Sequence, residues 1–262
     1  MGSARVLLRR VNGPGVLTML VLLGLWEALI RFGAIDFQNL PAPSAVAARS
    51  VDLVLSGELA GNVVHTLRVT LIGWTAASAV GIALGVLLGL WRPAWRWSMA
   101  SIEVLRAVPP VALVPVAVLL FGFSVRMELL LIVYAGAWPV LINTIDGVRH
   151  VRTELLDVAT MLRLSKLAAL RKIVLPAAMP AIAVGLRLAL SLALVLAVVA
   201  EMVGNPRGVG NALIAAQQAL QPEEMFAYVF TIGLLGIGLN AVFRSVAARA
   251  LPTPAPVRRR GR

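Results

Sequence analysis

A few ionisable side chains interrupt the long apolar runs of this 262-residue chain. Arg68, Arg106 and Arg187 lie near the ends of such runs, and Glu201 closes another. Charged groups in apolar segments often mark an ion path, so these residues predict a gate or a path for anions. The alternative is structural, with each side chain reaching the headgroup layer or forming a pair inside a helix bundle. Asn143 has apolar neighbours and is expected to hydrogen-bond between helices.

The chain lacks the residue sets that catalysis or nucleotide binding requires. It has no cysteine, which excludes disulfides, thiolate metal sites and thiol nucleophiles. His65 and His150 are too few and too far apart to indicate a metal site. No G-x-x-x-x-G-K-[ST] sequence is present, and the glycines of residues 204–210 follow an expected helix rather than a strand. With no Ser/His/Asp set visible, we expect no enzymatic activity, cofactor or metal in this chain.

The composition indicates that a membrane surrounds the elements that hold these residues. Hydrophobic residues make up 60% of the chain and charged residues 14%, against about 45–50% and about 25% in soluble domains. Several windows exceed the roughly 18 apolar residues that mark a bilayer span. The fold class is therefore all-α, a polytopic membrane protein. Many of the arginines behind the net charge of +12 flank the apolar runs, which indicates contact with membrane lipid and no nucleic acid.

Six spans are expected within a single domain that covers residues 1–262. They are about 16–32, 66–90, 99–122, 127–146, 180–201 and 226–247. The first resembles a signal peptide, but Glu27 interrupts it and no clear cleavage site follows, so we expect an uncleaved span. Most basic residues fall in the loops of one side, which predicts cytoplasmic termini and a cytoplasmic loop 150–178. On the other side, residues 36–61 contain an amphipathic run that predicts a short surface helix.

The third expected span is interrupted by prolines. Arg106 is followed by Pro109, Pro110 and Pro115, and each proline removes a helix hydrogen bond. The helix must be kinked or broken there, and its freed carbonyl groups need partners or a water-lined cavity. Two interpretations remain open: the span lines a translocation path, or the kink serves helix packing.

The long basic loop around Glu154–Pro180 is expected to form two short helices. Thr153 is placed to cap the first, whose opening turn carries Glu154. Ser165 can cap the second, and the chain should bend near Arg163. Pro176 is expected to end the second helix. The loop could lie in the headgroup layer or serve as a docking surface for a cytoplasmic partner.

Several motifs of the chain resemble those of the ATP-binding-cassette (ABC) importer permeases. Their cytoplasmic "EAA" loop reads E-A-A, three residues, Gly, nine residues, I-x-L-P. Here 157–159 (DVA) takes the E-A-A positions, Arg163 the glycine, and 173–176 (IVLP) the closing motif. Further motifs resemble the branch that imports nitrate, aliphatic sulfonates and taurine: 40–44 (LPAPS), 106–122 (R-x-x-P-P…F-G), 143–149 (NTIDGVR), 185–190 (GLRLAL), 200–204 (AEMVG) and 208–210 (GVG).

The resemblance implies a type I, MetI-like permease fold and a function in transport. The chain would form the translocation path for a small, anionic solute in a bacterial inner membrane. Its implied partners are two copies of an ABC ATPase, which binds ATP and Mg²⁺, an extracytoplasmic solute-binding protein and a second permease copy. The ATPase contacts carried over are Glu154, Asp157, Ala159, Leu162 and Arg163, with Ser165 beside them. The candidate path residues are Arg106, Pro109, Pro110, Pro115, Asn143 and Glu201.

Two points in this resemblance stay open. Arg163 replaces a glycine that usually makes the bend, and a non-glycine residue in the left-handed region costs about 1–2 kcal/mol. A self-contained secondary transporter or channel is the alternative function. It would predict an inverted repeat and paired intramembrane charges, and the sequence shows neither.

Overall fold

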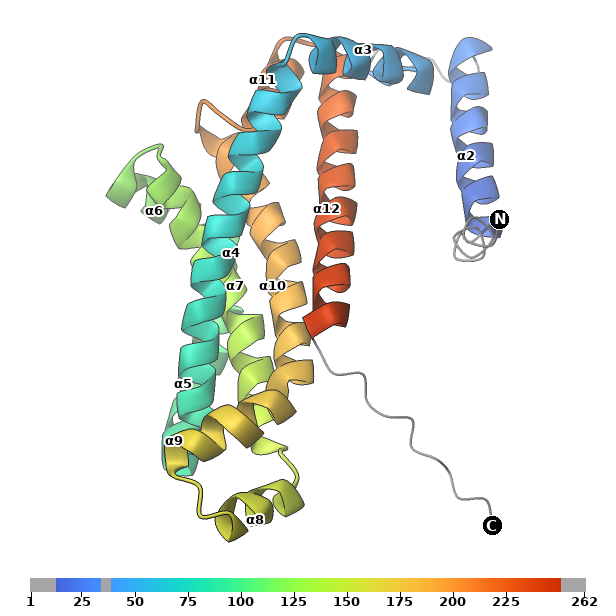
Figure 1. The fold of residues 1–262 in the computed structure, drawn as a ribbon. Coiled ribbons are helices and arrows are strands. Elements are labelled where there is room, and N and C mark those ends of the chain that lie inside the picture. Colours follow the sequence, from blue (N-terminus) through green and yellow to red (C-terminus); the bar gives the residue numbers. More distant parts are fainter. Residues whose placement is uncertain (1–12, 34–38, 251–262) are drawn as a thin grey trace.

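The computed structural model describes residues 13–33 and 39–250, and every regular element in those ranges is helical (Figure 1). The basic clusters expected to flank the first and last spans, at residues 5–10 and 258–262, lie outside the described residues. The helices are α2 (Gly13–Arg31), α3 (Pro43–Leu55), α4 (Glu58–Leu90), α5 (Arg92–Ala107), η1 (Pro110–Leu113), α6 (Val114–Phe121), α7 (Val125–Arg149), α8 (Thr153–Met161), α9 (Lys166–Ala169), η2 (Leu170–Val174), α10 (Leu175–Val203), α11 (Val209–Gln218) and α12 (Pro222–Ala250).

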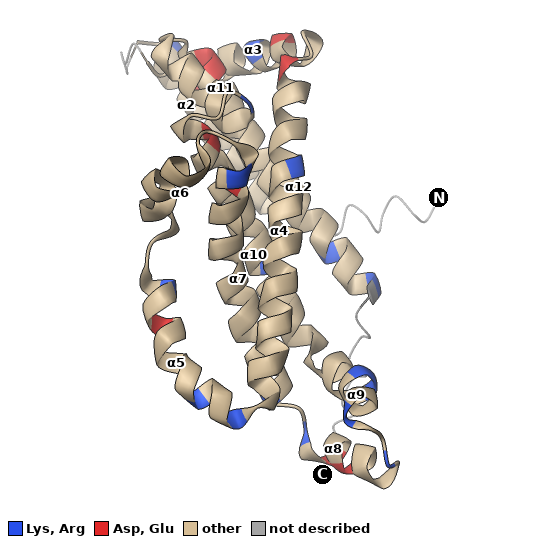
Figure 2. Cartoon of the chain, turned by 90° about the vertical axis from the view of Figure 1, so that its left-hand side faces the viewer, with Lys and Arg blue, Asp and Glu red and all other residues tan. Residues whose placement is uncertain are grey.

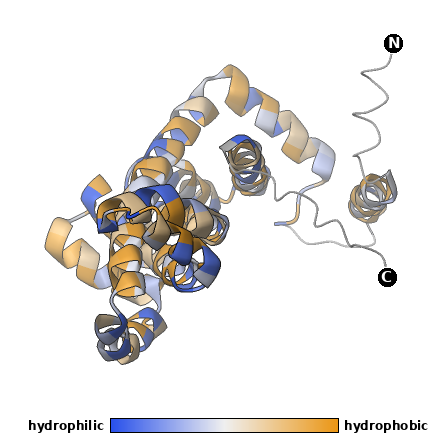
Figure 3. Cartoon of the chain, turned by 60° about the horizontal axis from the view of Figure 1, so that its bottom comes forward, coloured by the Kyte–Doolittle hydropathy of each residue, from blue (hydrophilic) through white to orange (hydrophobic). Residues whose placement is uncertain are grey.

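The membrane character expected from composition is confirmed. In the described residues, five helices are long and apolar enough to cross a bilayer, and there are six such spans if the bent pair of residues 92–107 and 110–121 is counted as one. Most helices extend beyond the apolar runs; α4, for example, begins at Glu58 rather than near residue 66. Many large hydrophobic side chains of these helices are exposed, as lipid-facing surfaces require. Figure 3 shows hydrophobic residues recurring along the helices.

The centre of the fold is a bundle of α4, α7 and α10, which make the most extensive helix contacts. One face of α4 carries a small residue at every fourth position, and each glycine lies against a side chain of α7. A Cβ at Gly81 or Gly85 would approach Val140 or Thr144 closer than side chains tolerate. Small residues let helix backbones approach closely, which is how helices associate in lipid. The small residues are Gly73, Ala77, Gly81, Gly85 and Gly89.

The third span is broken, as its prolines predict. The axes of residues 92–107 and 110–121 differ by 78° across the break. Val108 is extended, with φ −69° and ψ 119°, because the residue before a proline avoids the helical region. The carbonyl oxygen of Leu105, at the end of α5, accepts a hydrogen bond from the Tyr134 hydroxyl of α7. The same oxygen accepts from the Val108 N–H at 3.2 Å, so the backbone and a side chain of the neighbouring helix both supply partners at the break.

Short helices lie at both ends of the bundle (Figure 1). The expected surface helix is α3, which lies with α11 at one end, while α8 and α9 lie at the other. Glu27 of α2 accepts hydrogen bonds from the Ser44 backbone N–H at 3.0 Å and the Ser44 hydroxyl at 2.7 Å. A carboxylate beside the first turn of α3 is favoured by the helix dipole. Arg49 of α3 forms an ion pair with Glu224 of α12, which ties this end together.

Two details of the loop prediction are wrong. Thr153 is the first residue of α8, and Arg152 takes the capping position without a side-chain bond. Pro176 does not end a helix, because residues 166–203 form one continuous helical segment. A π-helical turn, Leu170–Val174, comes first and shifts the hydrogen-bond register. Pro176 is then the second residue of α10, where its missing N–H is tolerated.

Candidate functional site

The turn after α8 places a non-glycine residue in the left-handed conformation. Arg163 has φ 48°, and its N–H donates to the Thr160 carbonyl oxygen at 3.0 Å. The next N–H, of Leu164, donates to the Ala159 carbonyl oxygen, also at 3.0 Å. This pair of bonds defines a Schellman motif, which usually has glycine in the left-handed position. The bend expected near Arg163 is therefore confirmed. Arg163 adopts the left-handed backbone conformation that glycine usually takes in this motif.

The second short helix begins where its cap was expected. The Ser165 hydroxyl accepts a hydrogen bond from the Ala168 N–H at 3.3 Å. Ser165 is extended, with ψ 155°, so the chain changes direction within two residues of Arg163. Together the two residues fix the angle between α8 and the α9–α10 segment. Figure 1 shows α8 standing beyond the end of α10 as a separate arm.

Most side chains of the coupling candidates on α8 and in the turn after it face outward. Glu154, Asp157, Leu162, Arg163 and Ser165 are exposed. Ala159 is the exception, because it is buried where α8 packs on η2. The Glu154 backbone N–H, and then the Arg152 guanidinium, hold the pKa of the Glu154 carboxyl below its usual value. An ionised carboxylate is thus stabilised at the start of α8.

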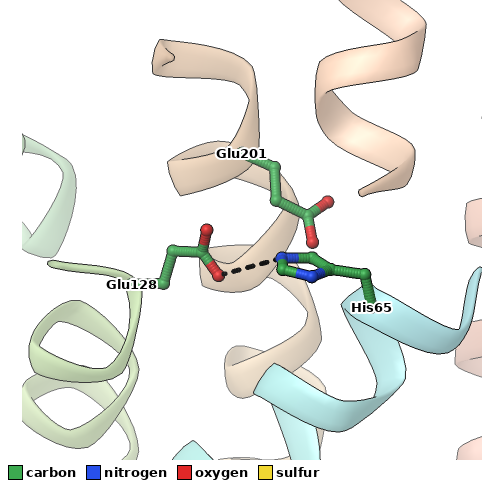
Figure 4. A group of neighbouring side chains, drawn as sticks. All are labelled: His65, Glu128 and Glu201. Atoms are coloured by element: carbon green, nitrogen blue, oxygen red, sulfur yellow. Dashed lines mark ion pairs between the residues drawn. The ribbon is translucent and has the colours of Figure 1, made fainter. Parts of the chain in front are cut away.

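A second polar site lies at the opposite end of the bundle, around Glu201 (Figure 4). Glu201 is fully buried at the end of α10. Its two carboxylate oxygens lie 2.7 and 2.9 Å from the Thr66 hydroxyl of α4, and one accepts a bond from the Gly210 N–H at 2.9 Å. Thr66 in turn accepts from the Val209 N–H at 3.0 Å. The carboxylate therefore joins α4, α10 and the start of α11.

The glycines after Glu201 make this contact possible. Gly208 has φ 98°, and a Cβ there would overlap the Glu201 carboxylate. A Cβ at Gly210 would meet the Val198 carbonyl oxygen and the Glu201 side chain. Only a chain without side chains at these positions can fold over the carboxylate and donate its N–H groups.

Glu201 forms a cluster with His65 and Glu128, called the outer cluster below. The sequence pointed to no role for His65 or Glu128. Glu128 of α7 is fully buried and accepts a hydrogen bond from the Asn205 side chain. Its second oxygen lies 3.8 Å from the His65 Nε2 of α4. Glu128 is an acidic residue in the first turn of an otherwise apolar helix. In the sequence, only this unusual position could have indicated a role for it.

The outer cluster has a donor set that can bind a metal, although its protein contacts already explain the arrangement. Atoms of His65, Glu128 and Glu201 lie within 4.8 Å of one another, and one histidine with two carboxylates suits a divalent transition metal. Both Glu201 oxygens, however, already interact with protein donors. We therefore interpret the cluster as a clamp between α4, α7 and α10.

Comparison with protein families identifies the class of this chain. The family model for binding-protein-dependent transport system inner membrane components matches residues 81–252. The chain belongs to this family. It is the permease subunit of an ABC importer, a transport component and not an enzyme. The self-contained transporter or channel is thereby set aside.

Curated relatives place the permease in the expected branch. It is 32% identical over 222 residues to the aliphatic sulfonates transport permease protein SsuC of Bacillus subtilis, covering 85% of this chain and 80% of that one. It is 30% identical over 249 residues to the nitrate import permease protein NrtB of Leptolyngbya laminosa, covering 91% and 88%. It is 35% identical over 169 residues to the bicarbonate transport system permease protein CmpB of Synechococcus elongatus, covering 64% and 61%.

Solved structures support the MetI-like fold. An inward-facing form of the MetNI methionine ABC transporter has a chain that matches with a TM-score of 0.63 at 18% identity, covering 73% of the permease and 94% of that chain. An amino acid ABC transporter crystallised with histidines matches with a TM-score of 0.55 at 16% identity, covering 78% and 95%. At these identities the likeness concerns the fold alone.

The path candidates of the permease fall into different surroundings. Arg106, Pro109 and Pro115 are exposed along the broken span, and Pro110 is half-buried. Asn143 packs between α7 and α10, beside Gly185. In the described part of the chain its amide donates to the Pro139 carbonyl oxygen of its own helix at 2.8 Å, so the expected bond between helices is wrong. Glu201 is buried in the outer cluster, and a role of these residues in transport stays a prediction.

Proposed function

We propose that this permease forms half of the translocation path of an ABC importer for a small anionic solute. Two copies would assemble with two ATPase subunits, which bind α8 and the start of α9. A solute-binding protein would dock at the α3–α11 end. When the two ATPases close around ATP, they would move α8 and, with it, α10. This movement would switch the path between an inward-open and an outward-open state.

The observation that carries this proposal is the exposed apolar surface of α8. The helix projects past the bundle, and its large hydrophobic side chains remain open to solvent. Met161 and Leu162 are exposed by 81% and 64%. Clustered apolar side chains of this kind mark a protein or membrane contact. The exposed set is Leu155, Leu156, Val158, Met161 and Leu162.

Charge supports a protein partner in the cytoplasm over burial in lipid. Glu154 and Asp157 lie exposed on the same helix, and carboxylates are poorly suited to a surface of anionic lipid. Figure 2 shows lysine and arginine gathered at the α8–α9 end of the bundle, with acidic residues prominent at the other. The positive-inside rule then supports a cytoplasmic position for α8 and for both termini.

The solute class rests on the relatives and on the charges of the chain. Relatives named for aliphatic sulfonates, nitrate and bicarbonate all act on anions that carry their charge on oxygen atoms. We extend that class to this permease.

The proposal of a second permease copy is based on the family resemblance. The proposed position of the binding protein is based on the fold, because the α3–α11 end lies opposite the end where the ATPase would bind.

Substitution of Asp157 tests the coupling role. We expect Asp157→Lys to leave the permease in the membrane while ATP hydrolysis no longer drives uptake, because a cation replaces the carboxylate on the docking surface. Asp157→Glu is the matched control, since it keeps the carboxylate. Both variants are compared in proteoliposomes with the ATPase and binding protein, by ATP hydrolysis and by uptake of a labelled solute. Unchanged uptake in Asp157→Lys would contradict the proposal.

A further inference from the structure

A groove between α10 and α12 contains a set of polar side chains in an otherwise apolar part of the bundle. The groove has a volume of about 500 Å³ and contains Arg187 and Ser191 from α10, with Asn240 and Arg244 from α12. A second hollow of about 360 Å³ shares Arg187, Ser191 and Asn240. Both volumes fall in the range of about 300–1,000 Å³ that small-molecule sites occupy.

The polar residues of the groove lie at membrane depth. Arg187 follows the first residue of α10 by twelve positions, about 18 Å along the helix axis. Asn240 precedes the last residue of α12 by ten positions, about 15 Å from that end. The surrounding helix segments are strongly apolar. A guanidinium at this depth is costly to expose to lipid, so it needs polar partners, which Asn240 supplies in part and water or an anion can complete.

The groove offers hydrogen-bond donors and lacks negative charge. Among its lining residues none is acidic. The Arg187 Nε donates to the Asn240 Oδ1 at 3.4 Å, and the Asn240 Nδ2 lies 3.3 Å from the Ser191 hydroxyl. Within the described part of the chain, neither the terminal nitrogens of Arg187 nor Arg244 has an acceptor. Both guanidiniums are therefore exposed and, among the described residues, without a counter-charge, Arg187 at membrane depth and Arg244 nearer the end of α12.

The walls of the groove leave room beside these cations. On α12 the wall contains Gly233 and Gly236, and a Cβ at Gly233 would meet nothing within 4 Å. Leucine, isoleucine and valine side chains form much of the remaining wall. An apolar pocket with a few convergent polar groups is the usual form of a small-ligand site.

We propose that Arg187 and Arg244, together with Asn240 and Ser191, bind an oxyanion during its passage through the membrane. Guanidinium groups pair with two oxygen atoms of one anion, and the amide and hydroxyl add further donors. Sulfonates, nitrate and bicarbonate meet this requirement, whereas a cationic or neutral solute would leave both guanidiniums unpaired. This inference rests on the proposed function and adds to it the location of the solute within the permease.

The absence of cysteine from the chain allows a direct test. In the complete transporter in proteoliposomes, Ser191→Cys is treated with two methanethiosulfonate reagents, one with a sulfonate and one with a trimethylammonium group. Rates are normalised to those of a free thiol. We expect the anionic reagent to react about tenfold faster than the cationic one, because the groove concentrates anions. Thr75→Cys, on the exposed face of α4, is the lipid-facing control and should stay unmodified.

Substitutions in the same cysteine variant identify the cations responsible. Arg187→Gln and Arg244→Gln should each remove most of the preference for the anionic reagent. Arg249→Gln is the matched control, since it lies on α12 outside the groove lining and should leave the preference unchanged. Arg187→Lys keeps the charge without the planar fork, so it should keep the preference but weaken protection by oxyanions.

Protection of the Ser191→Cys thiol by added anions distinguishes a binding site from a surface that is only positively charged. Nitrate and ethanesulfonate should slow modification of Ser191→Cys in a saturable manner, while chloride at equal ionic strength should not. An unreactive Ser191→Cys, equal rates for the two reagents, or equal protection by chloride would each overturn the inference. These reactions need no ATP, so they succeed or fail independently of the coupling between the ATPase and uptake.

Discussion

The N–H of Arg163 donates to the carbonyl oxygen of Thr160 at 3.0 Å while Arg163 holds φ 48°, so an arginine closes α8 in a conformation that favours glycine. Leu220 makes the same turn after α11, with φ 56° and its N–H bonded to the Gln217 carbonyl oxygen at 3.1 Å. Each residue bears the penalty of about 1–2 kcal/mol for the left-handed region. Both residues bear the same backbone strain, but only Arg163 is a candidate for contact with the ATPase. Comparing variants at the two positions therefore separates the effect of strain from the effect of the side chain.

Replacement by glycine should relieve strain at both turns. We expect Arg163→Gly and Leu220→Gly each to stabilise the permease by about 1 kcal/mol, which raises the unfolding temperature by about 2–4 °C. If the Arg163 side chain contacts the ATPase, only Arg163→Gly will also reduce ATP-driven uptake. Thermal unfolding of the purified variants measures the first effect and proteoliposome transport the second. A loss of stability in both variants would contradict the strain argument.

The approach of Gly208 to Glu201 predicts a large effect from one methyl group. Gly208→Ala should destabilise the permease by more than about 2 kcal/mol, because a Cβ would overlap the carboxylate and φ 98° is unfavourable for alanine. Gly61→Ala is the matched control, since a Cβ there meets nothing within 4 Å and the residue lies in α4. It should be stabilising by about 0.5–1 kcal/mol. Unfolding in an SDS titration compares the two, and equal effects would refute the role of Gly208.

The clamp around Glu201 predicts energetic coupling to Thr66. Thr66→Val removes the hydroxyl that interacts with Glu201 and accepts from Val209, and Glu201→Gln replaces one carboxyl oxygen by an amide nitrogen at similar volume. Each change should destabilise by about 1–3 kcal/mol, because buried polar groups lose partners. A double-mutant cycle should give a coupling energy of at least about 0.5 kcal/mol. Additive effects would show that the two side chains act independently.

Sequence patterns predicted the elements of this fold well because the membrane imposes length and hydropathy on each span. The break of the third span followed from Pro109 and Pro110, and the bend at Arg163 followed from the pattern of two short helices with Ser165 as a cap. The helix that passes through Pro176 was missed because it depends on a π-helical turn. Such a turn is a matter of hydrogen-bond register, which apolar periodicity does not encode.

The outer cluster was beyond the reach of sequence patterns. His65, Glu128 and Glu201 come from three helices and meet only because small residues let α4 and α7 approach closely. The fourfold spacing of glycine and alanine along α4 was a readable signal of that approach. The sequence does not show which side chain each carboxylate contacts, because that depends on how the helices are rotated against one another.

A site-specific cross-link can detect the proposed contact between α8 and the ATPase. In the cysteine-free chain, Met161→Cys places a thiol on the exposed face of α8, while Leu55→Cys places one at the end of α3, where the side chain is 79% exposed. Both are treated with a short thiol-to-amine cross-linker in the assembled transporter. We expect a permease–ATPase adduct from Met161→Cys and none from Leu55→Cys. An intact complex that yields no adduct from Met161→Cys, or one from Leu55→Cys, would contradict this account.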